Sequence, residues 1–339
     1  MLLGALVVRA KPKVKGRESV LSPIACTITV ALAAAFPDID YALFWWDPYR
    51  FITQWHRGLT HSLLMLPFWA VFLGVFFAIV SHQFTQWKAY SCWCALGLIC
   101  HIATDVLTIY GTQVFAPISN YTLALNLSFD VDPWIGMIIG ISLVGSYYYP
   151  VVSRWGLMLV IAFIIAKVLI QRSALSLVEA AAQAHVGINA KFYAIPQPLS
   201  PFHWKFIVDD QDYYKIAYVD LLKGVAYDRS FWPSSYKSKY SLDWGRDSRF
   251  GETLEDRKIA KKIWNHGEFS DFRRFAKLPA VYRIDRDSDG VCVWFTDLLH
   301  ILPGLLPPFR YGMCRSGKQN NWRIYRLRRF TKNLRQPIT

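Results

Sequence analysis

The sequence predicts an α-helical transmembrane bundle of about five spans, followed by a smaller α+β domain outside the membrane. Apolar residues are unevenly distributed along the 339-residue chain. Residues 20–175 contain several long runs with almost no charge, whereas the chain after about residue 190 has the mixed composition of a water-soluble protein. Crossing the hydrocarbon core takes about 20 apolar residues in a helix. A soluble protein with buried helices is the alternative, and four or five such runs in series disfavour it.

Five runs are candidates for the spans. The run at 62–81, "SLLMLPFWAVFLGVFFAIVS", has the length that a crossing needs. The run at 20–36 is short, but its Ala-rich apolar character still favours a span. The other three are 90–110, 133–149 and 155–170. Residues 171–189 are expected to continue the last span as a helix beyond the membrane, so the bundle would occupy residues 20–189.

The excess of basic residues, a formal net charge of +14, has two parts. The segment 1–19 carries "RAKPKVKGR" (9–17) beside the first span, and such a cluster marks the cytoplasmic side of a membrane. The remaining basic residues are spread among acids in the C-terminal domain, without a recognisable nucleic-acid motif. Membrane lipids are therefore the expected partner, and nucleic acid is not.

Tracing the spans outward from this cluster places the polar residues of the bundle near one face. The first span ends at the outer surface, where "PDID" (37–40) lies. The second span begins at the same surface, after "HRGLTHS" (56–62). The third span ends outside and is followed by the loop 111–132, which contains no Lys or Arg. The last span would leave the C-terminal domain, residues 190–339, outside the cytoplasm, in a periplasm or outside the cell.

The third span contains a histidine and an aspartate where lipid is expected. His101 and Asp105 are four residues apart, so a helix places them on one face, one turn apart. An Asp inside a membrane helix costs about 2.5–3.5 kcal/mol on insertion scales, so it needs a partner. A lone histidine on an apolar face usually just hydrogen-bonds to a neighbour. A histidine and an aspartate that face the same way favour metal ligation instead.

Asp38 and Asp40 in "PDID" stand at the end of the first span, behind a proline that favours a first helical turn or a break. For this motif alone, a pair of solvated acids at a helix exit is the simpler interpretation. The motif gains interest from the topology, which places it at the same face as the histidines.

His56 and His61 come just before the second span. They are five residues apart, so they do not share a face of an ideal helix. A backbone turn at Gly58 could nevertheless bring them towards a common point, with Thr60 as the N-cap of the span that follows.

Together these residues form a candidate metal site. Imidazole and carboxylate groups suit zinc best, with manganese or iron as alternatives, and six of them suffice for one metal with an open position or for two metals. A metal with an open position lowers the pKa of bound water, which then becomes a nucleophile, and polarises a carbonyl or phosphoryl oxygen. The candidate ligands are Asp38, Asp40, His56, His61, His101 and Asp105.

Two residues beside this set are candidate catalytic residues. Arg57 could hold a phosphate or carboxylate of the substrate, or its head could simply reach the lipid head groups. Asp132 in "FDVDP" could orient a histidine, as could Asp130, or it could cap the helix that begins at Pro133. The remaining histidines are expected to be structural: His82, His185, His203, His266 and His300.

The motifs "FPDIDY", "HRGLTHSLL", "HIATDVLTIYGTQVFAPIS" and "FDVDP", in this order, resemble the YdjM-like family of predicted membrane-bound metal-dependent hydrolases. The segments "PQPLSPFHWKFIV" (196–208) and "VWFTDLLH" (293–300) resemble the C-terminal region of that family. The resemblance implies an inner-membrane helical bundle with a metal held by Asp and His. It also implies a distant kinship with zinc-dependent phospholipase C and related nucleases, hence phosphoester hydrolysis.

The N-terminus departs from this pattern. Members of the family usually open with a short stretch containing Asp, Thr and His, which leads into a Gly- and Ala-rich helix. This chain begins with "MLLGALVVRA", which resembles the tail of that helix. Either the true start of the protein lies upstream, or the ligand set lacks one or two members.

The C-terminal domain reads as α+β. Short aromatic and β-branched runs such as "WKFIVDD", "YYKIAYVDLL", "AVYRID", "GVCVWFTDLL" and "WRIYRLRRF" suit antiparallel strands, and 252–278 suits one or two amphipathic helices that cover a sheet. "DRDSDG" (285–290) favours a tight turn between two strands over a calcium-binding loop. Cys292 and Cys314 could form a disulfide if the domain is extracytoplasmic.

The leading functional hypothesis is an enzyme. It is a membrane-embedded metal-dependent hydrolase that acts on a phosphoester or ester bond in a small-molecule, lipid or lipid-linked substrate. A non-catalytic membrane scaffold with a structural or degenerate metal site is the alternative. An ion-coupled transporter is a third hypothesis, because intramembrane acids and histidines can form an ion path. The clustering of the polar residues at one face and the lack of a visible inverted repeat disfavour it.

Overall fold

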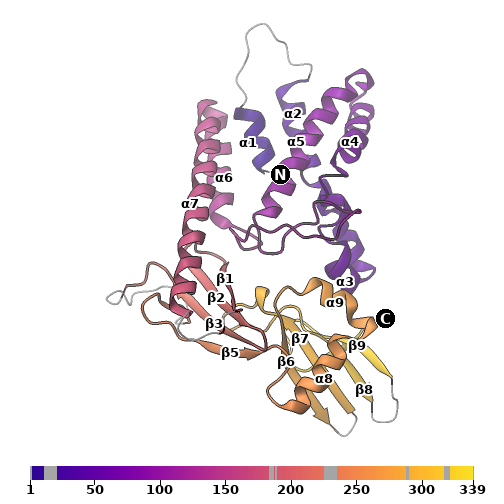
Figure 1. Cartoon of the computed structure of the whole chain (residues 1–339). Helices are drawn as coiled ribbons and strands as arrows, with labels where there is room; N and C mark the ends of the chain where they lie inside the picture. The colour runs from indigo at the N-terminus through magenta and orange to yellow at the C-terminus, as the bar shows by residue number, and fades with distance from the viewer. Residues whose placement is uncertain are drawn as a thin grey trace. The chain divides into compact units, whose positions relative to one another are not determined.

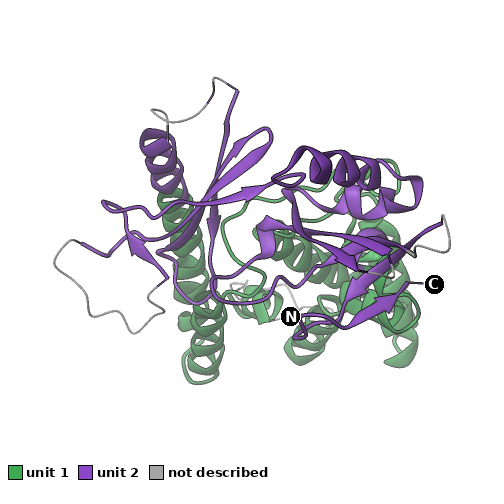
Figure 2. Cartoon of the chain, turned by 90° about the horizontal axis from the view of Figure 1, so that it is seen from below, with its two compact units in different colours: residues 1–51, 55–170 green, residues 52–54, 171–339 purple. Residues whose placement is uncertain are grey.

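The computed structural model describes residues 2–10, 21–182, 187, 189–224, 235–287, 290–316 and 321–338. The chain forms two compact units, which Figure 2 shows in different colours. The first comprises residues 1–51 and 55–170 and is helical, and the second comprises residues 52–54 and 171–339. Most of the basic segment predicted for 1–19 lies outside the described residues.

The first unit is built from helices of very different lengths (Figure 1). Short 3-10 or π segments join several of them. The α-helices are α1 (Leu2–Ala10), α2 (Pro23–Ala33), α3 (Pro48–Arg50), α4 (Leu66–Val80), α5 (Trp87–Val106), α6 (Pro133–Tyr148) and α7 (Val151–Ala182). The short segments are η1 (Phe36–Trp45), η2 (Phe51–Trp55), η3 (Leu59–His61) and η4 (Phe84–Gln86).

Several of these helices are suited to cross a membrane. Within the described residues, three helical stretches are long and apolar enough, namely Pro23–Trp45, Phe84–Val106 and Val151–Ala182. A fourth is present if Pro48–His61 and α4 count as one span despite the 70° bend between them. The unit is therefore a helical membrane bundle, as predicted, with three to four candidate spans; the expected number of about five is not confirmed.

One of the five predicted runs forms a helix that is short for a crossing. The run 133–149 forms α6, whose 16 residues extend only about 24 Å, less than the roughly 30 Å of a hydrocarbon core. α2 ends at Ala33, close to the predicted end of the first span at residue 36, and "PDID" follows in η1. Pro37 lies in the first turn of η1, and the chain continues there as a tighter helix to Trp45. Proline fits that position because the first turn of a helix has no use for its missing N–H. Asp38 and Asp40 therefore lie inside the first helical stretch.

Helices α2, α4 and α5 pack closely around a core of small and apolar side chains that includes Ala33, Leu73 and Leu98. At the contact between α2 and α5, a Cβ on Gly97 would lie only 2.5 Å from the carbonyl oxygen of Val30. Any side chain there would push the two backbones apart, so glycine is required at this position. This close approach matters for the site, because His101 follows about one turn later on α5 and Asp38 follows in η1 after the end of α2.

The second unit holds two five-stranded sheets. One has the order β1-β2-β3-β4, with β5 paired to β3, and the other has the order β10-β9-β8-β7-β6. All the pairings are antiparallel except that of β3 with β4. The strands are β1 (Lys191–Pro196), β2 (His203–Asp210), β3 (Tyr213–Asp220), β4 (Lys237–Ser238), β5 (Gly245–Ser248), β6 (Pro279–Asp287), β7 (Gly290–Asp297), β8 (Tyr311–Ser316), β9 (Trp322–Leu327) and β10 (Arg335–Pro337).

The strands predicted from the aromatic and β-branched runs are all present, which confirms the β-rich C-terminal domain. Helices α8 (Leu254–Trp264) and α9 (Ser270–Phe275) cover 252–278 as expected, and the ring of Trp264 lies 5.2 Å from that of Phe295 on β7. Asp287 pairs with Gly290 across the β6–β7 connection, so "DRDSDG" joins two strands as predicted, although its residues 288–289 lie outside the described part. Cys292 and Cys314 form a disulfide between β7 and β8.

A buried polar network ties the two sheets together. Lys205 on β2 is fully buried, and its Nζ donates to the carbonyl oxygens of Leu298, Leu299 and Ile301. Burial lowers the pKa of Lys205 to about 7, but the nearby Asp297 carboxylate opposes this fall. Three carbonyl acceptors also match the three donors of an ammonium group. The lysine thus fixes the segment after β7 onto the other sheet.

Candidate metal centre

His101 and Asp105 lie on α5, one turn apart, as the spacing predicted. Asp38 belongs to η1, which follows α2. Because α2 rests against α5 at Gly97, one turn before His101, the chain that leaves α2 reaches the same level as the pair on α5. The close packing of two helices thus sets the distance between Asp38 and His101.

His61 comes from η3, in the irregular segment between η2 and α4. The loop after α5 holds this segment in place. The hydroxyl of Ser62 donates to the carbonyl oxygens of Ala116 (2.6 Å) and Val114 (3.2 Å), and the Leu63 N–H also donates to Val114. The His61 side chain is completely buried. Its position is therefore fixed by two loops far apart in the sequence.

The local turn differs from the prediction in two respects. Thr60 is not the N-cap of the following helix, because α4 begins at Leu66 with Met65 as its N-cap residue. The Thr60 hydroxyl instead lies 2.9 Å from Nδ1 of His61. The left-handed residue of the turn is Arg57, with φ of 56°, and Gly58 has φ of −97°. The backbone therefore turns one residue before the expected position.

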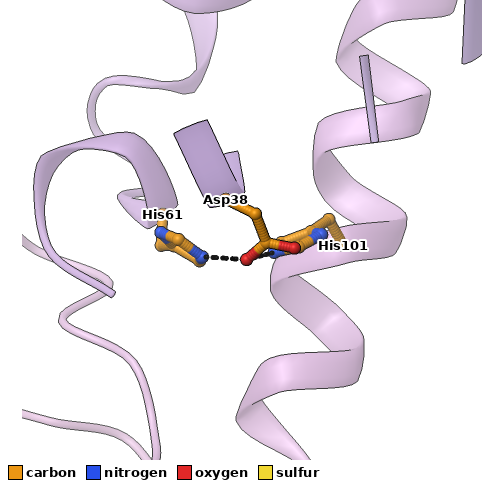
Figure 3. Close-up of side chains that lie close together, drawn as sticks. All are labelled: Asp38, His61 and His101. Atoms are coloured by element: carbon orange, nitrogen blue, oxygen red, sulfur yellow. Dashed lines mark ion pairs between the residues drawn. The ribbon is translucent and has the colours of Figure 1, made fainter. Parts of the chain in front are cut away.

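Asp38, His61 and His101 place ligand atoms within 4.8 Å of one another, as Figure 3 shows, and Asp105 lies beside both histidines. Oδ1 of Asp38 lies 3.7 Å from Nε2 of His61 and 3.7 Å from Nε2 of His101. Oδ2 of Asp105 lies 3.3 Å from each of the same two nitrogen atoms. Each histidine thus has two carboxylate oxygens at similar distances.

Three buried polar atoms at this point lack a hydrogen-bond partner among the described residues: Nε2 of His61, Nε2 of His101 and Oδ2 of Asp105. Leaving such atoms unpaired in a buried place is costly, and native structures rarely do so without a reason. Two ligand atoms held about 2.1 Å from one tetrahedral ion are about 3.4 Å apart. The four nitrogen–oxygen distances of 3.3–3.7 Å fit that spacing. Asp38 is the exposed member of the set, with 53% of its side chain accessible.

Asp40 and His56 lie on the other side of the His61 ring. Oδ2 of Asp40 is 3.6 Å from Nδ1 of His61 and 3.3 Å from Nδ1 of His56, and it accepts the Arg57 N–H at 3.2 Å. The Asp40 side chain is almost completely buried. Of the six predicted ligands, Asp38, His61, His101 and Asp105 therefore lie together. Asp40 and His56 lie on the Nδ1 side of the His61 ring.

Arg57 reaches the same centre through Asp105. Its guanidinium lies 3.4 Å from Oδ1 of Asp105, donates to the hydroxyl of Thr108 at 2.6 Å and stacks over the ring of Tyr110. Its side chain is only 11% exposed, so it is held within the protein. Sequence reasoning overlooked Thr108 and Tyr110. Both follow Asp105 within five residues, in the segment where α5 ends.

Asp132 performs the helix-capping role that the sequence left open. Its Oδ1 accepts the N–H groups of Trp134 and Ile135 at the start of α6. Its Oδ2 accepts hydrogen bonds from Ser128 and from Lys167 on α7. This ion pair provides the partner that a lysine inside an apolar helix needs.

Comparison with known proteins gives two matches. A sequence model of the YdjM inner membrane protein family matches residues 1–176. The Bacillus subtilis (strain 168) protein described as "Uncharacterized protein YfhP" is 30% identical over 122 residues, which is 36% of this chain and 36% of the relative. The chain thus matches about a third of the length of that relative. No solved structure matches the chain.

Proposed function

Because the chain belongs to the YdjM inner membrane protein family, we propose that its cluster of buried histidines and carboxylates makes it a membrane-embedded metal-dependent hydrolase. The observation that carries the proposal is the set of three buried atoms without hydrogen bonds, at Nε2 of His61, Nε2 of His101 and Oδ2 of Asp105. A cation placed among them would satisfy all three. Asp38 completes a set of two imidazoles and two carboxylates, which suits zinc best and also manganese or iron.

Some residues of the cluster would bind the metal, and others would position its ligands or the substrate. When bound, a divalent metal supplies Lewis acidity and lowers the pKa of water to near neutrality. His61 is completely buried and Asp105 is 13% exposed, so both hold their ligand atoms fixed, whereas Asp38 is half exposed and marks the side from which a substrate can approach. Arg57 places a positive charge next to Asp105, where it can orient the carboxylate or contact an anionic substrate group.

The proposed substrate is a phosphoester or ester in a lipid or lipid-linked molecule. Exposed apolar side chains lie on the same helical segment as Asp38, and they support a site open to lipid. Ile39 is 59% exposed, and Trp45 and Trp46 are each 87% exposed at the end of η1. Tryptophan side chains favour the boundary between lipid and water. A substrate with its polar group at that boundary would reach Asp38 without leaving the bilayer.

The C-terminal domain is proposed to lie outside the cytoplasm. The disulfide between Cys292 and Cys314 supports this placement, since disulfides persist in oxidising compartments and are rare in the cytosol. The basic cluster before the first span supports it as well, because positive charge marks the cytoplasmic side.

Metal removal tests the proposed function directly. The full chain, purified in detergent without added metal, is expected to contain about one divalent metal ion per chain and to hydrolyse a phosphodiester or carboxylic ester probe. Dialysis against a chelator should remove both the metal and the activity, and zinc or manganese should restore them. A protein that binds metal but cleaves no ester probe would favour the scaffold. A protein that binds no metal would contradict the proposal.

Asp40 is proposed to orient His61 and not to bind the metal. A histidine that binds a metal through Nε2 usually donates its Nδ1–H to a carboxylate or hydroxyl, and Asp40 and Thr60 both lie beside this Nδ1. Asp40→Asn is therefore expected to weaken metal affinity by about 10–100-fold while leaving the metal count at saturation unchanged. Competition with a chromogenic chelator measures the affinity.

Glu179→Gln is the matched control for Asp40→Asn, because Glu179 is an exposed acid on α7. The control should keep the parental affinity. If Asp40→Asn bound fewer metal ions at saturation than the parent, Asp40 would be a ligand, as the sequence first suggested, and its positioning role would be excluded.

A further inference from the structure

The last hairpin of the C-terminal domain carries a strong and unbalanced positive charge. Residues 322–338 include six basic residues and no Asp or Glu. The connection between β9 and β10, residues 328–334, is called the β9–β10 turn here, and it holds three of them. They are Arg328, Arg329 and Lys332, all exposed. Within the described residues, no carboxylate forms an ion pair with these three side chains. Arg335, just after the turn, differs because it pairs with Asp285 and Asp287.

The same turn exposes large apolar side chains. Phe330 is 94% exposed and Leu334 is 50% exposed. Phe330 also has a left-handed backbone, with φ of 63°, which is unfavourable for an aromatic residue. An ordered turn that presents a phenyl ring to solvent in a strained conformation points to a function for that ring.

Hydrogen bonds from the buried Arg310 side chain hold the β9–β10 turn in place. Arg310, which is 1% exposed, donates through Nη1 to the carbonyl oxygen of Thr331 and through Nη2 to that of Arg328. The Arg328 N–H donates to the carbonyl oxygen of Leu334 and closes the turn. The ring and the three charges are therefore presented together, and little conformational freedom would be lost on binding.

We propose that the β9–β10 turn docks on the bilayer surface, with Phe330 inserted at the boundary of the acyl chains and Arg328, Arg329 and Lys332 on anionic phospholipid head groups. Basic residues next to an apolar aromatic side chain are the combination that binds anionic lipid surfaces. Nucleic acid also attracts positive charge. Lipid is favoured because the domain is joined through α7 to a membrane bundle, so the bilayer is always near. Docking of this turn does not depend on the metal centre.

The experiment uses the full chain in lipid nanodiscs, either neutral or containing phosphatidylglycerol. A Phe330→Cys variant carries an environment-sensitive fluorophore, in a Cys92→Ser background because Cys92 is the exposed free thiol among the described residues. Lipids with a nitroxide near the head group act as quenchers. We expect the fluorophore to be quenched and blue-shifted in anionic discs, and high salt should reverse both effects. A Tyr240→Cys label, at an exposed position on another turn of the same domain, should show neither.

Charge reversal tests the contribution of the three basic residues separately from that of position 330. The triple change Arg328→Glu, Arg329→Glu and Lys332→Glu, in the labelled protein, should shift the docking equilibrium towards the undocked state by about 100-fold or more. A matched triple change on α8 should leave the quenching unchanged: Lys258→Glu, Lys261→Glu and Lys262→Glu, all at exposed positions.

Three results would overturn the proposal. The first is a label at residue 330 that stays unquenched in anionic discs. The second is equal quenching in neutral and anionic discs, which would remove the role of the basic residues. The third is a blue shift on adding single-stranded nucleic acid to the protein in neutral discs, combined with no shift in anionic discs, which would assign the turn to nucleic acid. The labelled protein without charge reversal already decides among these, so a folding defect of the triple variant would leave the outcome unchanged.

Discussion

His61→Ala is expected to lower the metal affinity of the purified protein by more than about 100-fold and to reduce ester hydrolysis by about 1000-fold or more. The side chain is completely buried, and its Nε2 lies 3.3 Å from Asp105 and 3.7 Å from Asp38. The loop that carries it is held in place through Ser62. Metal analysis by mass spectrometry and an assay with a phosphodiester probe measure the two effects.

The control for His61→Ala is His82→Asn. His82 is an exposed histidine after α4, with φ of 53°, a left-handed backbone that asparagine also tolerates. This variant should keep the metal content and activity of the parent. If His61→Ala retained its metal and its activity, the converging side chains would be only a packing arrangement, and the hydrolase proposal would be wrong.

Asp297→Ala is expected to lower the free energy of unfolding of the C-terminal domain by about 3–5 kcal/mol. The carboxylate of Asp297 is 1% exposed and accepts three backbone N–H groups, those of Lys277, Leu278 and Leu299. Alanine would leave these donors buried without a partner. It would also remove the negative charge nearest to the ammonium group of Lys205. The change therefore affects both sheets.

Proteolysis of the full chain in detergent at increasing urea concentration, scored on fragments of the C-terminal domain, measures this loss of stability. Asp243→Ala, which removes an exposed carboxylate from the same domain, should shift the midpoint very little. A midpoint for Asp297→Ala equal to that of Asp243→Ala would show that the backbone N–H groups find other acceptors and that the network is not important for stability.

The sequence predicted the elements of the fold better than their ends. Long apolar runs and alternating strands were identified because they depend on local periodicity. The sequence left open whether Pro37 begins a helical turn or breaks the helix. The structure uses that proline to begin a tighter helical segment that runs to Trp45. The choice depends on packing against α5, which no local pattern encodes.

In the candidate site, the sequence predicted that these residues lie close together, but not which of them face the same atom of His61. The four-residue spacing of His101 and Asp105 predicted a shared face, and the structure confirms it. Nothing in the sequence distinguished Asp38 from Asp40. The structure separates them, with Asp38 facing Nε2 of His61 and Asp40 facing its Nδ1. Which carboxylate faces Nε2 and which faces Nδ1 depends on the orientation of the His61 ring, and the sequence does not specify that orientation.

Lys167 is the residue that sequence reasoning should have singled out. It is the single cation of the apolar run 155–170 and lies near the end of that run, where an unpaired charge is costly. A search for its counter-ion near the outer face would have led to Asp132. Its ion pair with that residue would then have favoured the capping interpretation of "FDVDP" over a role beside the histidines.

Because α2 and α5 touch at Gly97, the geometry of the site depends on how the two helices are aligned. With no side chain between the backbones at Gly97, sliding one helix along the other by a single residue would displace Asp38 from His101 by about 1.5 Å. Coordination bonds tolerate a displacement of only about 0.2 Å. In the proposed metal centre, the thickness of the surrounding bilayer, which sets how far neighbouring spans tilt and slide, would therefore affect the ligand geometry.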